Sequence, residues 1–165
     1  MKSVALVALG SNLGNSASIV LNAIQRLQAF SEEPLLKSSL WQTTPVDCPP
    51  GSSPFVNAAV ALVPREGETP ETLLGKLQEL EREFGRQPKT ILNEARPLDL
   101  DLIAFGDEIR DSEMLTLPHA RAHQRKFVLQ PLSEIAPDFV FPDRSQTVAD
   151  LLTALQTDEV LVPIK

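Results

Sequence analysis

Two aspartates lie in a segment that otherwise has the composition of a buried strand, and their spacing suits a metal ion. The segment is RPLDLDLIAFG, residues 96–106, with Asp99 and Asp101 alternating with leucines. Side chains two apart on a strand share a face, so both carboxylates point away from the leucine core, with Cα atoms about 6.6 Å apart. Such a pair suits Mg²⁺, which takes one or two carboxylates plus substrate phosphates. An isolated Asp-x-Asp also fits a solvated outer face, because aspartate is mostly an exposed residue.

Basic residues gather near this pair in the sequence. Arg96 lies three residues before Asp99, and Arg86 and Lys89 precede it. A second group stands in LPHARAHQRKF and consists of His119, Arg121, Arg125 and Lys126. A site for a metal ion and a polyphosphate needs both signs of charge, whereas a surface network of ion pairs would use the same residues without chemistry. The segment GSNLGN lacks the Gly-Lys-Ser/Thr ending of a phosphate loop, so we interpret it as a turn.

The overall composition limits the class of protein and its partners. A chain of 165 residues that is 42% hydrophobic predicts one globular domain over residues 1–165. The net charge of −7 gives no general attraction for nucleic acid or an anionic membrane, so neither is expected as a partner. Cys48 is the only cysteine, and the apolar run over residues 4–9 is too short for a signal peptide. We therefore expect a cytoplasmic protein, and a monomer.

Apolar periodicity predicts alternating strands and helices. Strands are expected over residues 3–9, 36–43 and 55–63 and in the aspartate segment, with a first helix over 17–30. The order βαββαβ predicts a ferredoxin-like α+β sandwich, an antiparallel sheet with helices on one face, followed by a helical extension from about residue 121.

The second helix has the clearest sequence signals. Thr69 is the expected N-cap, Pro70 the first helical residue, and Gly85 lies beyond the end. Its apolar stripe consists of Leu73, Leu77, Leu80 and Phe84. Two irregular segments, about 44–54 and 86–97, flank the expected site, and we expect them to close over bound substrates.

Five segments occur in the order and spacing of one enzyme family. They are LGSNLG, FVNAAVAL, RPLDLDLIAFG, LPHARAHQRKFVLQPL and EIAPDFVFP, which together cover the chain from Val4 to about Leu152. In these segments the chain resembles the 6-hydroxymethyl-7,8-dihydropterin pyrophosphokinases of folate biosynthesis. The resemblance implies that ATP, with Mg²⁺, donates an intact pyrophosphoryl group to the hydroxymethyl group of a reduced pterin, releasing AMP.

The same resemblance implies a role for each matching residue. Asp99 and Asp101 would hold two Mg²⁺ ions and act in catalysis together with Arg86 and Arg96. The residues implied at ATP are Gln78, Glu81, Arg86, Arg96, Leu102, His119 and Arg125. The pterin ring would lie between Phe55 and Phe127, and its amide edge would be bound by Asn57 together with the backbone near Thr43 and Val46. Without the resemblance, Gln78 and Glu81 would be assigned to a solvated helix face and each Phe to the core. Trp41 is interpreted as structural.

The chain also departs from the family pattern. Asn93-Glu94-Ala95 stand where Trp-Gly-Pro is usual, and Pro88 and Ala120 replace a basic and an aromatic residue. These changes bear on nucleotide affinity and loop closure more than on the metal site.

Two other functions stay open on the sequence. One is a catalytically weak ferredoxin-like module that binds a pterin or nucleotide for regulation, against which the aspartate pair with Arg96 argues. The other is a different Mg²⁺-dependent phosphotransferase, against which Phe55, Asn57 and Phe127 argue.

Overall fold

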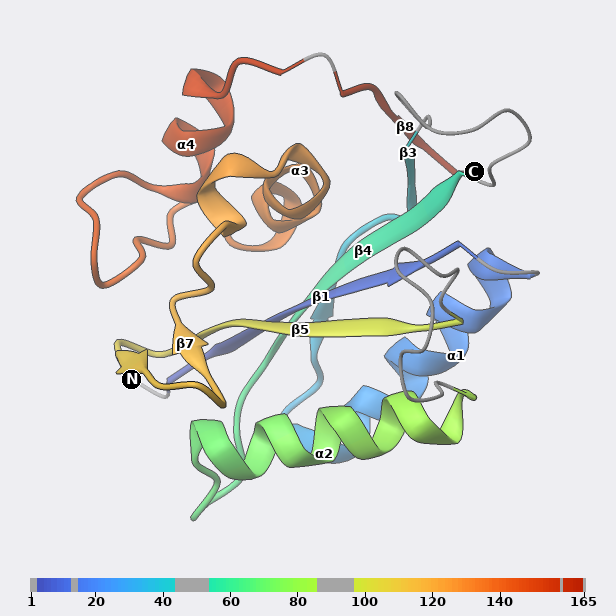
Figure 1. Cartoon of the computed structure of the whole chain (residues 1–165), viewed down its shortest axis with the longest axis vertical. Helices are drawn as coiled ribbons and strands as arrows, with labels where there is room; N and C mark the ends of the chain where they lie inside the picture. The colour runs from blue at the N-terminus through green and yellow to red at the C-terminus, as the bar shows by residue number, and fades with distance from the viewer. Residues whose placement is uncertain (1–2, 13–14, 44–53, 86–96, 158, 165) are drawn as a thin grey trace.

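The computed structural model describes residues 3–12, 15–43, 54–85, 97–157 and 159–164 (Figure 1). Its helices and strands are, in chain order, β1 (Ala5–Ser11), α1 (Ser16–Leu27), β2 (Leu36–Lys37), β3 (Trp41–Thr43), β4 (Phe55–Leu62), α2 (Pro70–Glu83), β5 (Asp99–Phe105), β6 (Arg110–Asp111), β7 (Thr116–Leu117), α3 (Lys126–Ile135), α4 (Val148–Ala154) and β8 (Leu161–Pro163). Short 3₁₀ turns occupy Gln28–Phe30 and Ala122–Gln124.

The main sheet is antiparallel and has the strand order β5-β1-β4-β3-β8, with β2 also paired to β4. β2 and β3 occupy the single strand expected over residues 36–43, which is interrupted between them. With these two counted as one strand, the central part follows the predicted βαββαβ order, and β1 lies between β4 and the last strand, β5. This arrangement is the ferredoxin-like sheet that the sequence predicts.

Helices cover both faces of the sheet, whereas the sequence placed them on one. β1 explains why, because all seven of its residues are buried and its side chains alternate between two hydrophobic cores. Val7 and Leu9 join the first core with α1 and α2, and Leu6 and Ala8 join the second with α3 and α4. Figure 1 shows α1 and α2 on one side of the sheet and α3 and α4 on the other. The predicted helical extension is therefore the second covering layer.

Helix α2 begins and ends where its sequence signals predict. The Thr69 hydroxyl accepts a hydrogen bond from the backbone N–H of Thr72, and Pro70 is the first helical residue. Gly85 follows the helix with a φ of +98°, a conformation that favours glycine. Leu73, Leu77 and Leu80 are buried in the first core.

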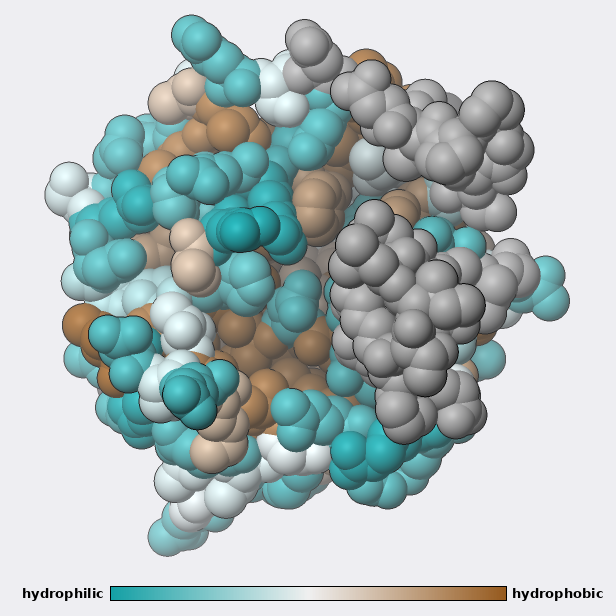
Figure 2. All heavy atoms as spheres, in the orientation of Figure 1, coloured by the Kyte–Doolittle hydropathy of each residue, from teal (hydrophilic) through white to brown (hydrophobic). Residues whose placement is uncertain are grey.

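On the face of the molecule seen in Figure 2, hydrophilic side chains cover most of the described surface.

Candidate functional site

The aspartates of β5 face away from the leucines, as the strand pattern predicts. Leu98, Leu100 and Leu102 are at most 5% exposed and pack in the first core. Asp99 and Asp101 are half-buried and project from the other face of the strand. Leu102 is also one of the residues that the family resemblance implies at ATP. Because its side chain lies in the core, a contact with a nucleotide would have to come from its main chain.

A row of paired residues joins Asp99 to Asn57 across three strands. Asp99 of β5 lies opposite Gly10 of β1, and Gly10 lies opposite Asn57 of β4. Residues directly opposite each other share a face of the sheet, so the carboxylate and the amide flank Gly10. A Cβ atom at Gly10 would lie 3.1 Å from Asn57 Nδ2. The glycine therefore provides the space that the amide occupies.

The Asn57 amide is fixed by a neighbouring hydroxyl. Asn57 is 5% exposed, and Thr43 Oγ1 donates a hydrogen bond to its Oδ1 at 2.7 Å. Thr43 is paired with Phe55, whose side chain is 42% exposed on the same face. The structure thus brings together three of the residues predicted to bind the pterin.

Phe127 and Arg125 lie at the beginning of α3, on the side of the sheet that carries Asn57. Phe127 packs against the second core while remaining half-exposed. The Arg125 guanidinium carbon lies 5.5 Å from the centre of the Phe127 ring, within the range of a cation–π interaction. An aromatic face and a positive charge are therefore presented by adjacent parts of the chain.

His119 is held beside β5 by its backbone, and its ring is oriented by a bond within its own loop. Its N–H donates to the carbonyl of Ile103 at 2.9 Å, and its Nδ1 accepts from the N–H of Arg121 at 3.2 Å. Burial lowers the pKa of His119, and the charge of Arg125 lowers it further, against the opposing effect of Asp99. A neutral His119 whose Nδ1 is an acceptor carries its proton on Nε2, so the ring can donate from that atom.

The two predicted nucleotide residues of α2 differ in environment. Gln78 is exposed, whereas Glu81 is only 6% exposed and its Oε2 accepts from the backbone N–H of Leu100 at 2.8 Å. The exposure of Gln78 is compatible both with a solvated face and with a nucleotide contact, whereas the burial of Glu81 excludes a solvated face for that residue. The signal was present in the sequence, because Glu81 follows Leu77 by four residues and lies on the apolar stripe.

A further contact, which the sequence did not predict, ties β3 to α3. Trp41 Nε1 donates to Glu134 Oε1 at 2.5 Å, and the N–H and hydroxyl of Ser39 also donate to the Glu134 carboxylate. These bonds support the structural role assigned to Trp41. No sequence spacing signals them, because the partners are more than 90 positions apart.

Several predicted features lie outside the described residues. They are Val46, Arg86, Lys89 and Arg96, the family departures at Pro88 and residues 93–95, and almost all of the two segments expected to close over substrates.

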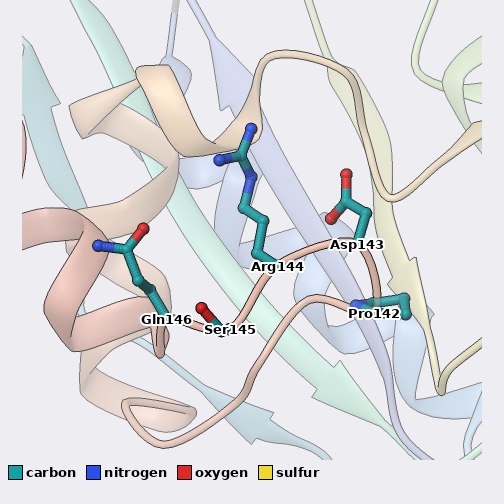
Figure 3. A pocket seen from close by; sticks show the side chains of 5 residues that line it. All are labelled: Pro142, Asp143, Arg144, Ser145 and Gln146. Carbon is teal, nitrogen blue, oxygen red and sulfur yellow. The ribbon is translucent and has the colours of Figure 1, made fainter.

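A shallow polar hollow lies elsewhere, along residues 142–146 (Figure 3). Asp143 and Arg144 point to one side of this loop. Burial, and then the charge of Arg144, lower the pKa of the nearby His123. None of the predicted site residues lines this hollow.

In the described part of the chain, no helix is long and apolar enough to cross a membrane.

Comparison with known proteins gives matches over most of the chain. Residues 6–137 match the family model described as 7,8-dihydro-6-hydroxymethylpterin-pyrophosphokinase (HPPK). The 2-amino-4-hydroxy-6-hydroxymethyldihydropteridine pyrophosphokinase of Haemophilus influenzae is 39% identical over 149 residues, which are 90% of each protein. The enzyme of that name in Bacillus subtilis is 32% identical over 160 residues, 96% of this chain and 88% of the relative.

Other relatives are much longer than this chain. The folic acid synthesis protein fol1 of Pneumocystis carinii is 37% identical over 146 residues, which are 87% of this chain and 19% of that protein. The crystal structure of an HPPK-DHPS in complex with substrates matches 93% of this chain with a TM-score of 0.72 and 12% identity, over 43% of its own length. Wild-type HPPK-DHPS of Plasmodium falciparum matches with a TM-score of 0.68 and 14% identity, over 93% of this chain and 41% of its own. These structural matches confirm the ferredoxin-like α+β fold.

Proposed function

This chain belongs to the 7,8-dihydro-6-hydroxymethylpterin-pyrophosphokinase family, whose members transfer pyrophosphate from ATP to hydroxymethyldihydropterin in folate biosynthesis, and we propose that it does so on the sheet face that carries Asp99 and Asn57. The observation that carries this proposal is the row Asp99, Gly10, Asn57 across β5, β1 and β4. This row supports the proposal because the Asp99 carboxylate, the proposed metal ligand, lies on the same sheet face as the Asn57 amide, the proposed pterin contact.

Asp99 and Asp101 are the proposed Mg²⁺ ligands, with two ions expected. The donor set fits, because two carboxylates on one face offer hard oxygen ligands and leave other coordination positions to phosphate oxygens and water. When bound, Mg²⁺ neutralises phosphate charge and makes the phosphorus under attack more electrophilic. The contribution of β5 is to hold both carboxylates half-buried, where electrostatic interactions are stronger than in bulk water.

His119 and Arg125 are proposed to bind the phosphates. The pKa of His119 is affected by both Arg125 and Asp99, which supports a common location for the three groups. The Nε2–H of neutral His119 would donate to a phosphate oxygen, and Arg125 would offer positive charge from the start of α3. Gln78 and Glu81 are proposed on the nucleotide side. Arg86 and Arg96 are proposed at the phosphates on the family resemblance alone.

The pterin is proposed to bind between Phe55 and Phe127, against Asn57. The amide of Asn57 can donate and accept together, as the amide edge of a pterin requires. Phe55 offers an exposed ring on the same face, and Phe127 a half-exposed one at the start of α3. Thr43 and Val46 complete the edge in this proposal. This arrangement would direct the hydroxymethyl group along the row toward Asp99.

The test measures AMP release from ATP, Mg²⁺ and hydroxymethyldihydropterin. We expect Asp99→Asn and Asp101→Asn each to lower turnover by about 10²–10³-fold or more, because each removes charge stabilisation in the transition state. The fold should persist, since both side chains face away from the first core. Asp107→Asn, in the exposed turn after β5, is the matched control and should be as active as the wild type. Wild-type AMP release by Asp99→Asn would contradict the proposal.

A further inference from the structure

Glu81 stands where helix packing alone would favour an apolar residue. Among the residues that the structure describes, it is the only charged residue that is buried as a whole, at 6% exposure. The side chain of Glu68 is also only 4% exposed, but it is paired with Lys76. Burial of a carboxylate is unfavourable unless it is paired or hydrogen-bonded, and an acid in the last turn of a helix is opposed by the helix dipole. Such a departure from local stability rules is typical of residues kept for function.

The hydrogen bond made by Glu81 reaches the metal-binding strand at one particular peptide. Its Oε2 accepts from the N–H of Leu100, the residue between Asp99 and Asp101. In the described part of the chain, β5 pairs with β1 alone, so N–H groups on its outer edge have no strand partner. Glu81 supplies the missing acceptor at that edge.

The backbone between the two aspartates is thereby held on both sides. Leu100 is in register with Leu9 of β1, its side chain is buried in the first core, and its N–H is bound by Glu81. A bond to an ionised acceptor is stronger than one between neutral groups. The Asp99–Leu100 peptide, which lies between the residues that carry the two carboxylates, therefore cannot shift without losing this bond.

We propose that Glu81 is a positioning residue for the metal-binding carboxylates, acting through the N–H of Leu100 and without itself touching the metal. This inference rests on the proposed function, because it takes Asp99 and Asp101 as the Mg²⁺ ligands. It goes beyond that function in giving Glu81 an effect on metal affinity that is separate from pterin binding.

The experiment compares two substitutions that differ in whether they keep the acceptor. Glu81→Gln retains a side-chain oxygen for the N–H of Leu100, whereas Glu81→Met has similar length and no such acceptor. Glu79→Met, on the exposed side of the same helix, is the control. Binding of Mn²⁺ is followed by electron paramagnetic resonance with an unreactive ATP analogue present, and the affinity for the metal-free analogue is measured by calorimetry, so that a lost nucleotide contact is told apart from weaker metal binding. Hydrogen exchange of the Leu100 amide and calorimetric titration of the pterin complete the comparison.

We expect Glu81→Met to raise the Mn²⁺ dissociation constant about tenfold or more, the usual effect of losing a group that orients a metal ligand. Exchange of the Leu100 amide should become faster in this variant, and pterin affinity should stay unchanged. Glu81→Gln should restore Mn²⁺ binding close to the wild-type value, and Glu79→Met should leave it unaltered. Either wild-type Mn²⁺ affinity in Glu81→Met or equal losses in the Gln and Met variants would overturn the proposal.

Three further variants make every outcome decisive. If circular dichroism shows that Glu81→Met does not fold, Glu81→Asp replaces it. The aspartate side chain is one methylene shorter, so its carboxylate no longer reaches the N–H of Leu100. The proposal then requires the same rise in the Mn²⁺ dissociation constant in Glu81→Asp. Asp99→Asn and Asp101→Asn, measured alongside, test the premise. If these two bind Mn²⁺ like the wild type, the proposed function itself fails, whereas loss of binding in them with no effect at Glu81 refutes only the role of Glu81.

Discussion

At the scale of single residues, the orientation of the Asn57 amide in the proposed pterin site is set by its neighbours. Thr43 fixes the oxygen end of the Asn57 amide, and the absence of a side chain at Gly10 leaves room for its nitrogen end. An amide held in one orientation loses little conformational freedom when it binds a ligand. We therefore attribute part of the expected pterin affinity to the way Thr43 and Gly10 hold this amide in one orientation.

Gly10→Ala tests this attribution. The new methyl group would lie 3.1 Å from Asn57 Nδ2, so the amide must shift, and we expect pterin binding to weaken by about 1–3 kcal/mol. Calorimetric titration with an unreactive ATP analogue measures the change. Gly75→Ala is the control, because nothing lies within 4 Å of the added Cβ and the residue is in a helix. Equal pterin affinity in Gly10→Ala and the wild type would show that the amide is not held by this contact.

A second prediction concerns His119 and pH. The folded state lowers its pKa from 6.5, chiefly through burial. As pH falls below about 6.5, the unfolded chain takes up the proton first, so the free energy of unfolding should decrease until the folded pKa is passed. Denaturant unfolding should show that the free energy of unfolding decreases less between pH 8 and pH 5 in His119→Gln than in the wild type.

His123 must be measured alongside, because burial lowers its pKa in the same direction. His123→Gln should remove a separate part of the pH dependence of the free energy of unfolding. In the double variant this free energy should depend on pH less than in either single variant. If His119→Gln and the wild type lose stability in parallel, the pKa of His119 is not lowered by folding.

At the scale of elements, α3 connects the two ends of the proposed pterin site. Its beginning carries Arg125 and Phe127, and its later turns carry Glu134, which accepts hydrogen bonds from β3. β3 in turn ends at Thr43, the partner of Asn57. Helix α3 thus contributes Phe127 to the proposed pterin site. It also fixes β3, the strand that contributes Thr43.

Glu134→Ala should release β3 from α3. The variant removes the acceptor for Trp41 Nε1 and for Ser39, and we expect the free energy of unfolding to fall by about 1–3 kcal/mol. Trp41 is the only tryptophan, so its fluorescence emission reports the change directly. Glu113→Ala, at an exposed position, should alter neither quantity. An unchanged emission spectrum in Glu134→Ala would mean that the bond does not persist in solution.

The elements differ in how far the sequence could predict them. α2 was predictable because its signals are local: Thr69, Pro70 and Gly85 each act within a few residues of the helix ends. β8 was not, because its three residues become a strand only by pairing with β3, more than 100 positions away. The interruption between β2 and β3 also depends on a distant partner, since Ser38 Oγ accepts from the N–H of Ala59. Local chemistry specifies helix ends, whereas tertiary pairing decides short strands.

At the scale of the whole molecule, one sheet joins two hydrophobic cores. Because β1 contributes to both, neither core can be lost while the other stays intact. Leu77→Ala in the first core and Leu129→Ala in the second should each lower the free energy of unfolding by about 2–5 kcal/mol. Both variants should keep a single transition that coincides by circular dichroism and Trp41 fluorescence. Two separate transitions in either variant would show that the cores unfold independently.

The candidate site was predictable in part. The shared face of Asp99 and Asp101 follows from strand alternation, but their place beside Asn57 depends on the register of three strands, which no local pattern determines. The roles of Phe55 and Phe127 came from family resemblance, since periodicity alone would assign each to the core. The cytoplasmic location and the monomeric state stay predictions.

In the proposed site, the row Asp99, Gly10, Asn57 would also limit the length of the acceptor that can react. Neighbouring strands are about 4.8 Å apart, so roughly 10 Å of backbone-defined distance separates the two outer residues of the row. A side-chain substitution can change the affinity for either ligand. The distance between the backbones of Asp99 and Asn57 changes only if the strands pair in a different register. An acceptor lengthened by one carbon, with hydroxyethyl in place of hydroxymethyl, would keep its ring contacts and bring its oxygen to the wrong point. The sheet would thus select its acceptor by reach as well as by ring chemistry.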